Sequence, residues 1–249
     1  ASYLRDNGNL YNNPDTDYNT NINITRYNFR SNIDMSLTKT TTLSLEIGAN
    51  MTDAHQPRPI TSSNNFQSQA SELFSACYQQ DPITTPVRVP LGYNEFGEMQ
   101  WGWGAPLSTS VGNPAERLFG SGYNKTYRTS VMSQIILKQN LDFLTKGLDF
   151  TASFSYDVNT VSIQSRGKYS SLYAVNGVDD ETGLYSLVPK REGDEFLGYS
   201  YSNTGDRADE FKAQFNYERV FNERHRVGAM AMYYQRSFNN LAAGSSILA

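Results

Sequence analysis

Four aromatic side chains that could bind a ligand lie close together in the sequence between residues 81 and 103. The segment reads DPITTPVRVPLGYNEFGEMQWGW and contains Tyr93, Phe96, Trp101 and Trp103. Exposed aromatic rings stack on the flat faces of sugars and anchor protein partners. The segment therefore indicates a contact with a substrate or a partner, although packing of the rings against their own loop is the simpler explanation.

The residues with catalytic potential do not form a recognisable motif. The two histidines, His55 and His225, lack the spacing of a zinc site. The adjacent carboxylates Asp179 and Asp180 lie in the sequence DDETG, which is typical of a turn rather than of a glycosidase pair. The single cysteine, Cys77, excludes an intrachain disulfide and is expected to be half-buried. We therefore expect no enzyme activity, no metal and no cofactor.

Composition and charge exclude further classes of protein. The chain carries 25 acidic and 21 basic residues, so it does not have the basic surface that nucleic acids require. Aromatic residues make up 13% of the chain, which argues against disorder. The sequence contains no run of about 18 apolar residues, which a transmembrane helix would require.

Alternation of polar and apolar side chains is the strongest pattern in the sequence. From Tyr27 to Leu37 the odd positions are apolar except Ser31, and the even positions are polar. The same period of two continues from residue 42 to Met51 after a short polar turn. Two long alternating runs joined by a short turn predict a hairpin at about residues 22–52.

The same pattern predicts two further hairpins, at about residues 126–157 and 207–236. Long connections, about 53–125 and 158–206, separate the three hairpins. Short turns on one side and long loops on the other are typical of outer-membrane barrels, in which the short turns are periplasmic. We therefore expect an all-β chain, part of one antiparallel membrane β-barrel, with six long strands and two extracellular loops. Residues 63–80 are expected to add a short helix.

Charged residues on the polar side of these strands would face the lumen of such a barrel. They would form a solvated wall, contact an internal domain or line the path of a polar solute. The candidate lumen-facing residues are Arg26, Arg30, Asp34, Glu46, Lys138, Asp142 and Asp149.

Four segments, in one order along the chain, resemble the SusC-like TonB-dependent transporters of Bacteroidetes. They read RYNFRSNIDMSLTKTTTLSLEIGA, NPAERLFGSGY, LKQNLDFLTKGLDFTASF and YERVFNERHRVGA, beginning at residues 26, 113, 137 and 217. The second segment departs from the family's Asn-Pro-x-Ala pattern, because Ala115 follows Pro114 directly and Glu116 takes the last place.

The resemblance implies a barrel of about 22 strands with an N-terminal plug. It also implies energy supplied through TonB and a SusD-like surface lipoprotein as partner. The plug and the TonB box are not among these 249 residues, so we expect the chain to be an internal barrel segment.

The expected function is active import of an oligosaccharide or a peptide across the bacterial outer membrane, where the chain would contact lipid. An alternative from another class is a soluble or surface-attached carbohydrate-binding β-domain that uses the aromatic loop. A β-rich polysaccharide-degrading enzyme is a third hypothesis.

Overall fold

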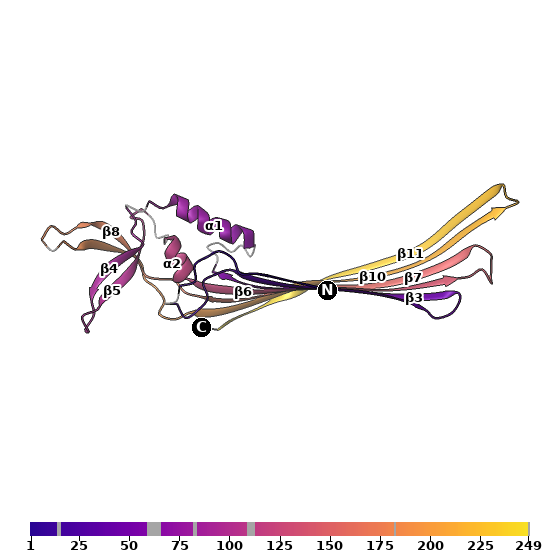
Figure 1. Cartoon of the computed structure of the whole chain (residues 1–249), viewed down its shortest axis with the longest axis horizontal. Coiled ribbons are helices and arrows are strands. Elements are labelled where there is room, and N and C mark those ends of the chain that lie inside the picture. The colour runs from indigo at the N-terminus through magenta and orange to yellow at the C-terminus, as the bar shows by residue number, and fades with distance from the viewer. Residues whose placement is uncertain (14–15, 59–65, 82–83, 109–112, 182, 249) are drawn as a thin grey trace.

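The computed structural model describes residues 1–13, 16–58, 66–81, 84–108, 113–181 and 183–248. Its strands form two sheets, and the fold is all-β with mainly antiparallel pairing. Seven strands form one long sheet in the order β1-β2-β3-β6-β7-β10-β11, and four short strands form a second sheet in the order β4-β5-β8-β9. The short turns of the long sheet lie at one end, and the second sheet and the helices lie at the other (Figure 1).

The three hairpins expected from the sequence are present as β2–β3, β6–β7 and β10–β11. Their strands run further than the alternation indicated, because regular pairing continues into the expected loops. A seventh strand, β1, which the sequence did not indicate, pairs with β2 at the edge of the sheet. The strands of the long sheet are β1 (Ser2–Asp6), β2 (Asn23–Ser36), β3 (Thr41–Pro57), β6 (Gly122–Asn140), β7 (Leu148–Gly167), β10 (Gly198–Phe221) and β11 (His225–Leu248).

The register of the long sheet brings side chains of the same kind together on each face over its central strands. Residues directly opposite each other in neighbouring antiparallel strands point to the same face. One row across five strands is apolar, and the adjacent row on the other face is polar. The apolar row is Ile33, Leu45, Ile135, Phe154 and Phe211, and the polar row is Asn32, Glu46, Gln134, Ser155 and Glu210.

The long sheet is curled into half of a barrel. A hollow of about 340 Å³ lies on its polar face, lined by residues that include Arg30, Glu46, Gln134 and Asp157. The polar face is therefore concave and the apolar face convex. Large apolar side chains on the convex face are about half exposed, Tyr27 and Phe29 at 51% and Ile135 at 46% among them.

The turn between β6 and β7 corrects one expectation about the barrel wall. Asp142 lies in this turn and not on a strand, so it does not share the polar face. Its carboxylate accepts hydrogen bonds from the Gly147 backbone N–H (2.6 Å) and from the side-chain amide of Asn140 (3.1 Å). Asp142 therefore shapes the turn, and the other six candidate wall residues lie on the concave face.

The two segments expected as long loops contain helices and strands of their own, and we call this part of the molecule the cap. It comprises the described parts of residues 58–121 and 168–197. Its elements are α1 (Phe66–Gln79), β4 (Arg88–Tyr93), β5 (Met99–Gly104), α2 (Pro114–Phe119), β8 (Leu172–Val178) and β9 (Tyr185–Arg191). Most of the buried apolar side chains belong to the cap: Val89, Ala105, Leu118, Leu172 and Ala174.

The predicted helix at residues 63–80 corresponds to α1, although residues 63–65 lie outside the described part of the chain. Cys77 is in this helix but is exposed, not half-buried as expected. No helix in the described residues is both long and apolar enough to cross a membrane.

Candidate functional site

Asn113 starts α2 and attaches it to the second sheet. Its side-chain oxygen accepts a hydrogen bond from the Glu116 backbone N–H (2.8 Å), which is the usual role of an N-cap, and Pro114 follows at the first helical position. The side-chain amide donates to the carbonyl oxygens of Val87 (3.0 Å) and Gly104 (2.9 Å). One fully buried asparagine therefore fixes α2 against β4 and β5.

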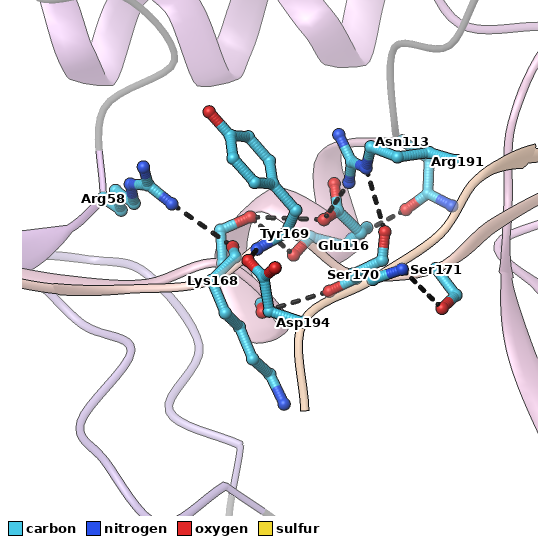
Figure 2. Close-up of polar contacts among 12 residues, drawn as sticks. Arg58, Asn113, Glu116, Lys168, Tyr169, Ser170, Ser171, Arg191 and Asp194 are labelled. Carbon is cyan, nitrogen blue, oxygen red and sulfur yellow. Dashed lines mark hydrogen bonds and ion pairs between the residues drawn. The ribbon is translucent and has the colours of Figure 1, made fainter. Parts of the chain in front are cut away.

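A buried ion pair joins the two segments of the cap. Glu116 on α2 accepts a hydrogen bond from Arg191 at the end of β9 at 3.0 Å, and the Glu116 side chain is 3% exposed. Arg191 also donates from Nε to the Ser170 carbonyl oxygen (3.0 Å), and Ser170 Oγ donates to the Gly120 carbonyl oxygen (3.1 Å). Figure 2 shows how these contacts hold the second segment to α2.

Tyr169 lies between two guanidinium groups at the start of the second segment (Figure 2). The Cζ atoms of Arg58 and Arg191 are 5.1 Å and 5.2 Å from the centre of its ring, within the range of cation–π interactions. The Tyr169 backbone N–H donates to the Asp194 carboxylate (2.9 Å), and the Asp194 N–H donates back to the Tyr169 carbonyl (2.8 Å). Asp194 is therefore held in place although it is exposed.

The described part of the connection between β1 and β2, within residues 7–22, lies beside the cap. The Tyr18 hydroxyl donates to the Phe119 carbonyl oxygen (2.8 Å) and accepts from the Gly122 N–H (3.1 Å). Burial raises the pKa of Tyr18 above its usual value, so this hydroxyl keeps its proton at neutral pH. On the other side of the connection, His55 Nε2 donates to the Asn19 carbonyl oxygen (2.7 Å).

A cleft of about 500 Å³ opens between three walls. β4 and β5 provide one wall, the β1–β2 connection the second, and residues 168–173 with Asp194 the third. Both aromatic and charged side chains line it. The aromatic ones are Tyr18, Trp101, Trp103, Phe119 and Tyr173, and the charged ones are Asp17, Arg88, Lys168 and Asp194.

A glycine in β5 makes part of this cleft possible. A Cβ atom at Gly102 would lie 2.7 Å from Cδ2 of Tyr173 and 3.0 Å from Cδ2 of Leu91. Any other residue at this position would displace the Tyr173 ring. Gly102 therefore permits the close approach of β8 to β5, where Trp103 and Leu172 pair in parallel.

The structure separates the four aromatic residues singled out in the sequence. Trp101 and Trp103 line the cleft. Tyr93 and Phe96 lie at the end of the β4–β5 hairpin, outside the cleft, and are 72% and 87% exposed. The charged residues of the cleft were missed because they come from three segments that have no common sequence signal.

Four of the candidate wall residues line two hollows of the concave face. Arg30 and Glu46 line the central hollow of about 340 Å³, and Lys138 and Asp149 line one of about 400 Å³ near the short turns. Arg26 shares this face by register, and Asp34 accepts a hydrogen bond from Ser44. Within the described residues, no group of three His, Cys, Asp or Glu side chains is arranged to hold a metal ion.

No model of a known protein family matches this chain, and no curated protein sequence matches it.

Proposed function

We propose that this chain forms part of the wall of a transmembrane β-barrel in a bacterial outer membrane. The observation that carries the proposal is the apolar row on the convex face, which continues across β2, β3, β6, β7 and β10 while the matching row on the concave face is polar. A membrane-spanning strand needs about 9–11 residues, and β2 to β11 in the long sheet have between 14 and 24. If the convex face were in contact with water, this large apolar surface would remain exposed, which is unusual in a soluble protein.

The transport function is proposed from the same architecture together with the resemblance to SusC-like transporters. The chain would take part in TonB-dependent import of an oligosaccharide or a peptide. The short turns would be periplasmic and the cap extracellular, where a SusD-like lipoprotein would meet it. The polar hollows of the concave face would then lie inside the barrel and border the path of the solute.

Membrane extraction and uptake test the two parts of this proposal separately. The full-length protein should stay in the membrane fraction in alkaline carbonate and high salt and should dissolve only in detergent. Uptake of a labelled oligosaccharide or peptide by cells should stop when TonB is deleted or the proton gradient is collapsed. Release by carbonate would reject the barrel, and uptake unaffected by the loss of TonB would reject the transport mechanism.

The second candidate is a soluble or surface-attached carbohydrate-binding β-domain. The cleft beside Trp101 and Trp103 favours it, because aromatic rings with neighbouring carboxylates suit a sugar ligand. Extraction distinguishes the two candidates, since this domain would leave the membrane fraction without detergent.

A further inference from the structure

Of the five aromatic side chains that line the cleft, Trp101 is the most exposed. In β5, Trp101 and Trp103 are two residues apart, so both side chains project to the same face of the strand. The Arg88 guanidinium lies 3.4 Å from the ring centre of Trp103 and occupies one face of that indole. Trp101 is 56% exposed and also lines the cleft. Trp101 is therefore the side chain on which a flat ligand can stack.

Charged groups of both signs surround this platform. Asp17 comes from the β1–β2 connection, and Lys168 and Asp194 come from the second segment of the cap. One oxygen of Asp194, Oδ2, accepts the Tyr169 N–H, so the carboxylate is oriented while its second oxygen can accept another donor. With Arg88, the cleft holds two carboxylates and two cations, which does not favour a strongly charged ligand.

A sugar ring fits this combination better than an apolar or a highly charged molecule does. The C–H face of a pyranose packs on an indole, and its hydroxyls both donate to carboxylates and accept from an ammonium group. The cleft volume of about 500 Å³ is typical of small-molecule sites. We infer that the cleft binds one pyranose ring of a neutral saccharide, stacked on Trp101 and hydrogen-bonded by Asp17, Asp194 and Lys168.

This inference rests on the proposed function in one respect, that the bound saccharide is the transported solute. Binding in the cleft itself can be measured without transport. The full-length protein in detergent would be titrated by calorimetry with neutral gluco-, manno-, galacto- and xylo-oligosaccharides, with uronic-acid oligomers and with a mixture of short peptides. At least one neutral saccharide should bind. Binding should also change tryptophan fluorescence.

Three variants locate the binding. Trp101→Ala should weaken the Kd about tenfold or more, the size expected for loss of one stacking contact and its buried surface. Trp101→Phe should recover part of the affinity, because it keeps an aromatic face. Phe96→Ala is the matched control, since it removes an exposed ring from the same hairpin outside the cleft and should leave the Kd unchanged.

The inference is overturned if no neutral saccharide binds, if uronic-acid oligomers or peptides bind instead, or if Trp101→Ala binds as the unaltered protein does. Circular dichroism and thermal unfolding of each variant show whether the fold is kept. If Trp101→Ala unfolds, protection of Trp101 from oxidation by the bound saccharide replaces it, and absence of protection overturns the inference. If the protein binds a saccharide but leaves the membrane fraction in carbonate, the saccharide site is supported and the barrel is rejected.

Discussion

Among single residues, Glu116 and Arg191 form an ion pair that joins the two segments of the cap. Replacing Glu116 with alanine would leave the guanidinium of Arg191, which is 26% exposed, without its carboxylate partner. Removing one member of a buried pair costs about 3–5 kcal/mol, and the partial exposure of Arg191 places the expected cost near the lower value. Hydrogen exchange should show faster opening of the amides of residues 168–197.

The exposed pair between Arg226 and Glu218 is the matched control for this prediction. Glu218→Ala should change stability by only about 0–1 kcal/mol, because water already solvates both groups. Unchanged exchange in the cap after Glu116→Ala would show that the pair does not hold the two segments together.

The carboxylate of Asp142 should make the β6–β7 turn sensitive to acid. The hydrogen bond from Gly147, and then that from Asn140, hold the pKa of Asp142 below its usual value. A lowered folded-state pKa stabilises the fold above the unfolded-state pKa, and this stabilisation is lost as the pH falls through the folded-state pKa. In urea unfolding, the protein should therefore be more stable than the Asp142→Asn variant at pH 6. The difference should begin to shrink as the pH falls below about 4 and should be lost once the pH is below the folded-state pKa. A difference that is constant with pH would contradict this role.

At the scale of elements, the two faces of β6 should respond oppositely to a charge. Ile135 lies six residues from Leu141, where the turn begins, which corresponds to a depth of about 14 Å for a strand tilted by about 45°. Ile135→Arg would place a cation near the middle of the bilayer and should cost about 2–4 kcal/mol. Folding into lipid vesicles, followed by the gel shift of the folded form, measures the effect.

The neighbouring residue provides the control for this experiment, because Gln134 lies on the concave face of the same strand. Gln134→Arg should fold as well as the unaltered protein. Equal effects at the two positions would count against a lipid-facing convex surface.

At the scale of the whole molecule, the cap and the short turns should lie on opposite sides of the membrane (Figure 1). Cys77 is exposed and would react, so a Cys77→Ser background is needed. In that background, Phe96→Cys on the β4–β5 hairpin should react with a membrane-impermeant maleimide in intact cells. Lys146→Cys in the β6–β7 turn should react only after the outer membrane is opened. The reverse labelling pattern would invert the proposed orientation.

The long sheet could be predicted from the sequence because its information is local. Side chains of period two between Tyr27 and Met51 define both faces of β2 and β3 before any pairing is known. The same reasoning identified β6, β7 and β10. The alternation is weaker in β11, where Met230, Met232 and Tyr234 lie on the concave face. β1 was missed, since five residues are too few to show the period.

The cap could not be predicted in the same way. Its sheet joins strands of six or seven residues, and the contact between Trp103 and Leu172 spans about 70 positions. The Asn113-Pro114 pair is a helix-start signal that could have located α2. No comparable signal predicts that Asp17, Lys168 and Asp194 line the same cleft as Trp101, because all three lie outside the helices and strands and are far apart in the sequence.

The six long strands, their hairpins and the two faces of the sheet therefore follow from local patterns in the sequence, because a period of two sets the direction of successive side chains in a strand. The structure was needed to show that the long connections contain the elements of the cap, and that Trp101 and Trp103, but not Tyr93 and Phe96, line a cleft. Such a cleft depends on contacts between distant segments, such as Glu116 with Arg191 and Tyr18 with Phe119. Contacts between distant segments produce no periodic pattern in the sequence, so they cannot be predicted from it in the way that strands can.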